Sequence, residues 1–148
     1  MSPNTKRAML GLEEAGLDRT RLFLTNAVKH FKFEPRGKRR LHQNPTTGEI
    51  DICRWWLDKE RAFVRPALIV TLGVSALRGV TGKSARIASM RGAVHGLEGG
   101  SKLVATIHPS FLLRLPDRER AADSGVGVEQ VARTVETMLG GRVVTRYK

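Results

Sequence analysis

The stretch ALIVTLG, residues 67–73, decides the fold class of this chain of 148 residues. A nearly unbroken apolar run that ends in glycine is typical of a strand buried on both faces of a sheet. Two further runs have the same character: RLFLTNA, residues 21–27, and KLVATI, residues 102–107. Helical patterns separate the three runs, so the sequence predicts an α/β fold: a central, mostly parallel sheet with helices on both faces, a three-layer α/β/α sandwich.

A long helix is predicted directly before residues 67–73. Thr46 and Thr47 offer a hydroxyl N-cap, and Glu49 suits the first turn of the helix. An apolar stripe continues to Val64, and the helix is expected to stop at Arg65-Pro66. Elsewhere we expect a short helix over residues 74–80, a polar, glycine-rich loop over most of residues 81–100, and helices over residues 4–15, 111–114 and 128–139.

Polar side chains follow two of the predicted strands abruptly. Thr25-Asn26 ends the first strand, and His108-Pro109-Ser110 follows the last one. Ligands of open parallel sheets bind outside the carboxyl ends of the strands. We therefore expect one crevice to collect Asn26, His108, Ser110 and a loop that carries His42.

That loop is VKHFKFEPRGKRRLH, residues 28–42. It carries six basic residues against one acid, Glu34, and its charges fall on every side of a helix. We predict a long exposed loop that meets an anion, with a titratable imidazole at its end. A solvated basic loop without a ligand is the plain alternative.

Composition points to a polyanionic partner. Lysine and arginine number 26 against 14 acids, a net charge of +12, which favours nucleic acid. The single cysteine excludes an intramolecular disulfide. No signal peptide and no apolar segment of membrane-spanning length is present in the sequence, so we expect a soluble, cytoplasmic protein with no membrane partner.

Five motifs occur in a characteristic order: LTNAVKH, GKRRLH, CRWWL, LIVTLG and VATIHPS. Over about residues 8–114 the chain resembles the UdgX-type uracil-DNA glycosylases, relatives of the iron–sulfur bacterial enzymes of the same superfamily. The resemblance implies that uracil is flipped out of DNA and that its N-glycosidic bond is broken. It also implies that a loop histidine, here His42, becomes covalently linked to the deoxyribose.

The resemblance implies roles for further residues. Asn26 would recognise the edge of uracil, and His108 would stabilise negative charge on uracil O2. Lys38, Arg39 and Arg40 would hold the phosphates beside the lesion, and Ser110 and Arg114 would support the DNA backbone. Without the resemblance, Asn26 reads as a turn former and His108 as a buried structural histidine.

A [4Fe–4S] cluster is expected for the family, and His30 and Cys53 match two of its ligands. Taken alone, Cys53 on the inner stripe of a helix is typical of a small core residue. The chain lacks the family's first cysteine pair and the N-terminal third that carries it, so the first strand region of the sheet and part of the ligand set are expected to be missing.

Residues 121–148 also depart from the family pattern. We therefore divide the chain into a glycosylase-like part, residues 1–120, and a divergent helix and basic tail, residues 121–148. Two functions stay open: a uracil-DNA glycosylase trapped on the abasic sugar, and a truncated, inactive DNA-binding module. Both predict a monomer that binds uracil-containing DNA, single-stranded as well as double-stranded.

Overall fold

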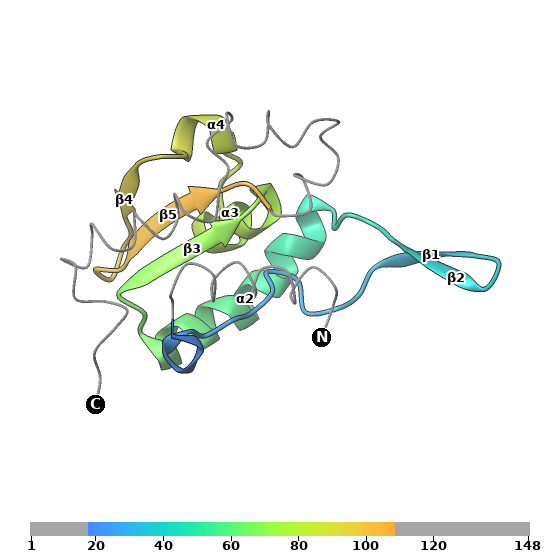
Figure 1. Ribbon diagram of the computed structural model, residues 1–148, viewed down its shortest axis with the longest axis horizontal. Helices are drawn as coiled ribbons and strands as arrows, with labels where there is room; N and C mark the ends of the chain where they lie inside the picture. The colour runs from blue at the N-terminus through green and yellow to red at the C-terminus, as the bar shows by residue number, and fades with distance from the viewer. Residues whose placement is uncertain (1–17, 109–148) are drawn as a thin grey trace. The chain divides into compact units, whose positions relative to one another are not determined.

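The computed structural model describes residues 18–108. The chain divides into two compact units, one of Leu24–Ala105 and one of Met1–Phe23 with Thr106–Lys148. In the second unit the structure describes a 3-10 turn, η1 (Arg19–Arg21), whose first turn is closed by a bond from Arg21 N to Asp18 O. The remaining elements follow along the chain in Figure 1: β1 (Phe33–Arg36), β2 (Arg39–His42), α2 (Thr47–Val64), β3 (Leu68–Leu72), α3 (Val74–Thr81), α4 (Ile87–Met90), β4 (Val94–Gly96) and β5 (Lys102–Thr106).

A three-stranded sheet with the order β3-β5-β4 forms the centre of the larger unit. The strands β3 and β5 run in the same direction (Figure 1), whereas β4 is antiparallel to β5, with Val94 opposite Val104. The predicted strands at residues 67–73 and 102–107 are thus confirmed, and so is the α/β class. Within the described residues the sheet is mixed, because a short antiparallel strand joins its parallel pair.

The long helix α2 begins and ends where the sequence predicts. Thr46 is its N-cap: the hydroxyl accepts a bond from Glu49 N, and the Glu49 carboxylate accepts one from Thr46 N in return. At the other end, Arg65 adopts a left-handed conformation with φ of 48°, and its N–H donates to Arg61 O. Proline follows and prevents continuation.

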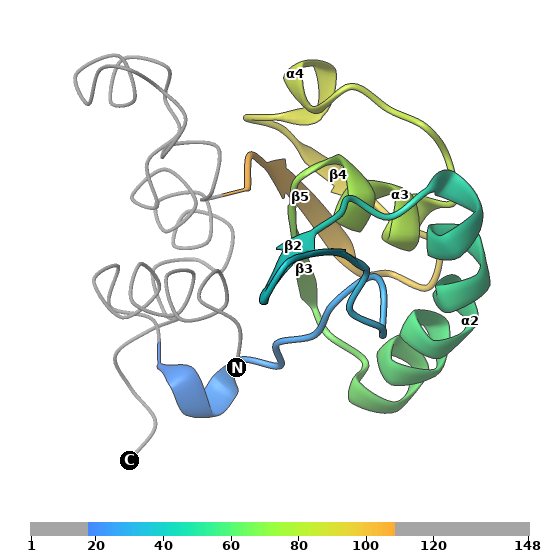
Figure 2. The same cartoon turned by 90° about the vertical axis from the view of Figure 1, so that its right-hand side faces the viewer.

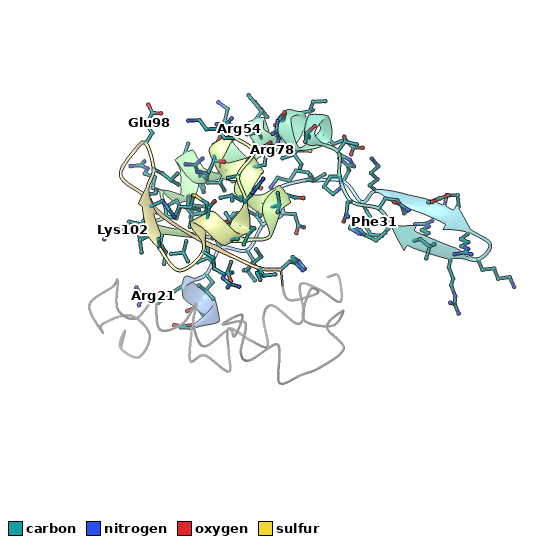
Figure 3. The ribbon with its side chains drawn as sticks, turned by 90° about the horizontal axis from the view of Figure 1, so that it is seen from above. Arg21, Phe31, Arg54, Arg78, Glu98 and Lys102 are labelled. Atoms are coloured by element: carbon teal, nitrogen blue, oxygen red, sulfur yellow. The ribbon has the colours of Figure 1, made fainter. Side chains whose placement is uncertain are left out.

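The core lies between the sheet and the helices α2 and α3, which lie on the same face of the sheet (Figure 2). Five buried side chains form it: Leu57, Leu77, Val80, Leu103 and Ala105. A bidentate ion pair also joins the two helices, because the Arg78 guanidinium donates to both carboxylate oxygens of Asp51 at 2.9 and 2.7 Å. Arg78 is labelled beside α2 in Figure 3.

One prediction of secondary structure is wrong. Residues 22–26 form no strand, and Phe23 is 56% exposed rather than covered on both faces. The run belongs to neither of the two sheets of the described residues, which contain β1 with β2 and β3, β5 and β4. Residues 81–100 are mostly loop, as predicted, and they also contain the two short elements α4 and β4. The predicted helices at residues 4–15, 111–114 and 128–139, and the boundary at residue 120, lie outside the described residues.

Between residues 18 and 108, none of the helices combines the length and apolar character needed to cross a membrane.

Candidate functional site

The basic stretch is a β-hairpin rather than the irregular loop predicted. β1 and β2 pair antiparallel, with Phe33 opposite His42 and Arg36 opposite Arg39. Gly37 makes the turn possible, because its φ of 60° is a conformation that side-chain-bearing residues rarely adopt. The predicted exposure is confirmed for every residue of both strands. Figure 1 shows the hairpin extending away from α2 and from the sheet of its unit.

The register sorts the side chains of the hairpin onto two faces. Residues directly opposite each other in an antiparallel pair share a face, and faces alternate along each strand. Phe33 and His42 therefore share one face with the pair Pro35 and Arg40. The opposite face carries Glu34, Leu41, Arg36 and Arg39. Two adjacent cations, Arg39 and Arg40, thus point to opposite sides.

Two phenyl rings lie on the same face of the hairpin as His42. The Phe31 ring stacks on Phe33 with centroids 5.6 Å apart, and it lies 5.4 Å from the His42 ring at a tilt of 45°. The Arg40 guanidinium lies over the Phe33 ring, 4.8 Å from its centroid. Phe31 is labelled in Figure 3 where the chain enters the hairpin. The predicted nucleophile therefore stands in an aromatic cluster with one cation at its edge.

Glu49 fastens the base of the hairpin to the start of α2. Lys32 donates from Nζ to a Glu49 carboxylate oxygen at 2.9 Å, and Gln43 N donates to Lys32 O at 2.9 Å. The pKa of the Glu49 carboxyl is lowered from 4.5 to about 2, chiefly by the bond from Thr46 N and then by the Lys32 ammonium, against a smaller opposing effect of burial. The hairpin thus projects from a fixed base.

The segment around Asn26 is held by α2 and α3, although it is not the end of a strand. Thr25 Oγ1 and Lys29 Nζ both donate to a Glu60 carboxylate oxygen at 2.7 Å. Burial raises the pKa of the Glu60 carboxyl, but these bonds from Lys29 and Thr25 outweigh it, so the net pKa lies below its ordinary value. The Asn26 side chain between them is exposed, as a group that recognises a ligand must be.

His30 and Cys53, the two predicted metal ligands, lie close together. His30 Nδ1 is 3.8 Å from Cys53 Sγ, and His30 Nε2 is 3.9 Å from a Glu49 oxygen. Cys53 is buried at 6% exposure, as expected of a core residue. No cluster of three or more histidine, cysteine or acidic side chains within residues 18–108 is arranged to hold a metal ion.

This donor set does not fit a [4Fe–4S] cluster. Such a cluster takes four ligands, usually four thiolates. Cys53 is the single cysteine of the whole sequence, and His30 supplies one imidazole. The proximity of these two residues agrees with the predicted pair, but residues 18–108 contain no third such ligand arranged beside them.

Other predicted site residues are distributed over both units. Asn26, His42 and the hairpin cations belong to the unit of Leu24–Ala105. His108, half-buried, belongs to the other unit, and Ser110 and Arg114 lie outside the described residues. The single crevice therefore stays a prediction. Sequence reasoning did not identify Phe31 and Phe33 as neighbours of His42, although their spacing of two, matched to a strand, was a usable signal.

Comparison with known proteins places these residues in context. Residues 3–126 match the sequence model of one protein family, which is described as the uracil DNA glycosylase superfamily. A type-4 uracil-DNA glycosylase of Thermotoga maritima is 36% identical over 104 residues, which are 70% of this chain and 50% of that protein. The chain thus spans about half the length of this curated relative.

Proposed function

This chain belongs to the uracil-DNA glycosylase superfamily, and from that membership we propose that it excises uracil from DNA and is trapped on the abasic sugar through His42. The observation that carries the proposal is the hairpin. It holds four exposed cations, Arg36, Lys38, Arg39 and Arg40, and ends in an exposed histidine within a chain of this family. The proposed protein works as a monomer in the cytoplasm on single-stranded as well as double-stranded DNA.

Binding comes first in the proposed sequence of steps. The hairpin cations neutralise phosphates beside the lesion, which fixes the register of the strand but reads no base. Extruding the nucleotide costs a few kcal/mol, so the flipped uracil must gain contacts in return. The exposed Asn26 amide suits this task because it offers both a donor and an acceptor to the uracil edge.

Cleavage of the N-glycosidic bond passes through an oxocarbenium-like sugar, as in other glycosyl transfers. The bonding electrons leave with uracil, and His108 stabilises the charge that develops on O2. The lone pair of a neutral His42 nitrogen then bonds to C1′ of the sugar. The resulting imidazolium loses its N–H proton to solvent, and the uracil anion takes up a proton, so charge and atoms balance.

No step of this proposal uses an iron–sulfur cluster, because the chain's one cysteine and its neighbour His30 do not complete a ligand set.

A DNA-binding module without chemistry is the second candidate. The observation that favours it is the span of the chain, about half that of the type-4 relative. Such a module would keep the hairpin cations and would bind DNA without breaking the glycosidic bond.

Incubation with a uracil-containing single-stranded oligonucleotide, followed by a denaturing gel, separates these candidates. The wild-type chain should give a slowly migrating adduct that survives denaturant, since unfolding does not break a covalent C–N bond. His42→Ala should remove the adduct and leave an abasic product, because water then reaches the sugar carbon. His108→Ala should suppress both by about 10²–10³ in rate.

His95→Ala is the matched control, because His95 lies on β4 with its ring bonded to Met90 O and should affect neither product. An adduct that persists in His42→Ala would overturn the assignment of the nucleophile. Retained DNA binding without adduct or abasic product in the wild type would establish the module.

A further inference from the structure

Phe31 and Phe33 are exposed aromatic residues that no role described above uses. Phe31 is 56% exposed and Phe33 is 39% exposed. Their ring contacts are with each other, with His42 and with Arg40, all of them in or beside the hairpin. Two phenyl rings kept at the surface leave apolar area in water, which is costly unless a ligand covers it.

We propose that Phe31, with Phe33 and Arg40 behind it, forms a stacking site for an unpaired nucleobase that flanks the excised uracil. The inference rests on the proposed function, because it takes His42 as the residue that meets the target sugar. It adds a binding site for a second nucleotide and makes an unpaired neighbouring base the preferred context for excision.

Geometry supports a stacking ligand. The Phe31 and Phe33 rings are inclined by only 23°, so they form a nearly continuous aromatic step on one face of the hairpin. Planar bases stack on such rings in a sequence-tolerant manner, since every base has a π-face. Because Phe31 contacts the His42 ring, a base on Phe31 belongs to a nucleotide close to the target in the same strand.

Charge supports nucleic acid as the occupant. Arg40 shares the face of Phe33 and lies over its ring, so a cation lies on the same surface as the rings, and Lys38 follows in the turn. Alternating aromatic and basic side chains are the usual makeup of surfaces that bind single-stranded nucleic acid. An apolar protein partner would instead have to leave these cations without counter-charges.

Base pairing should prevent this contact. In a duplex both faces of each base are covered by neighbouring base pairs, whereas an unpaired base can turn one face to the protein. The stacking site therefore distinguishes unpaired from paired bases rather than one kind of base from another.

The test measures binding of the full chain to two labelled oligonucleotides of equal length and charge that contain no uracil. One is an oligothymidylate, and the other carries abasic residues in place of the bases. We expect the wild type to bind the base-bearing strand about 5- to 150-fold more tightly, the range for stacking of about one base. Phe31→Leu, which keeps an apolar side chain but removes the ring, should reduce this preference several-fold with an unchanged salt slope.

Phe63→Leu is the matched control, because Phe63 is 89% exposed on α2, away from the hairpin, and should retain the wild-type preference. Equal wild-type affinity for the two strands, binding of neither strand, or equal preferences in the two variants would overturn the stacking site. Since neither strand contains uracil, the result is independent of excision. A preference that depends on Phe31 in a chain that forms no adduct would leave this inference standing and reject the proposed activity.

Discussion

At the scale of single residues, Glu49 connects two parts of the site. Its carboxylate completes the capping box of α2 with Thr46 and accepts the Lys32 ammonium from the base of the hairpin. Both bonds favour the ionised form, which is why the pKa of Glu49 falls to about 2. Protonation of one side chain should therefore loosen both the start of the helix and the base of the hairpin.

Glu49→Gln tests this linkage. The folded-state pKa lies below the ordinary 4.5, so Glu49 contributes its full stability above about pH 5 and loses it as the pH falls toward about 2. The difference in free energy of unfolding between wild type and Glu49→Gln should be largest near neutral pH and shrink over this range. Urea denaturation at a series of pH values measures it. A difference that stays constant with pH would contradict the role.

At the scale of elements, the hairpin determines which cations act together. Lys38 lies in the turn, while Arg39 and Arg40 point to opposite faces. A single strand that follows one face can meet Lys38 and one of the two arginines. A strand or duplex that wraps the hairpin can meet all three.

Neutralising Lys38, Arg39 and Arg40 together should weaken DNA binding and flatten its salt dependence. Each phosphate contact to a single strand contributes about 0.7 to the log–log slope. We therefore expect the slope to fall by about 1.4 if one face is used, and by about 2 if all three cations meet phosphates. Titrations at several salt concentrations measure the slope. An unchanged slope would show that the hairpin is not part of the DNA-binding surface.

The contact between α2 and α3 depends on a small residue. A Cβ at Gly79 would lie 3.0 Å from Ala27 Cβ and 3.3 Å from Leu57 Cδ2. Gly79 thus lets the segment next to Asn26 approach the two helices closely, and this contact helps to position the amide.

Gly79→Ala should lower the free energy of unfolding by up to about 2 kcal/mol, because overpacking of about 1–3 kcal/mol exceeds a gain in helix propensity of about 1 kcal/mol. Gly48→Ala on α2 is the control, since open space surrounds Gly48 and the substitution should stabilise by up to about 1 kcal/mol. Denaturant unfolding of both variants measures these changes in the free energy of unfolding. Equal stabilisation by the two substitutions would show that Gly79 has room.

At the scale of the whole molecule, the number of available ligands limits how a cofactor could be held. Four corners of a [4Fe–4S] cluster need four donors, and the chain brings one thiolate and one adjacent imidazole. A cluster with two unliganded corners is readily lost to solvent.

The purified chain should therefore contain iron and sulfide far below the level of one cluster per molecule. Iron and sulfide analysis with the visible absorption spectrum measures this. Stoichiometric iron with a brown colour would contradict the prediction and would point to ligands contributed by a second chain; a Cys53→Ser variant that loses the colour would identify the thiolate involved.

The sequence by itself determined the features whose causes are local. The Thr46–Glu49 capping box spans four residues, Arg65-Pro66 ends α2, and the apolar runs of β3 and β5 identify buried strands, so each was predictable without knowledge of the fold. Motif order likewise pointed to the superfamily that the comparisons show.

Only the tertiary structure decided the features that depend on pairing over distance. Residues 21–27 have the composition of a strand, but they belong to neither sheet of the described residues, because composition does not specify which segments pair. His30 meets Cys53, and Phe31 meets His42, across 23 and 11 positions of chain. The faces of the hairpin follow from a register in which a slip of one residue would move His42 away from Phe33, and that register is a property of two strands together.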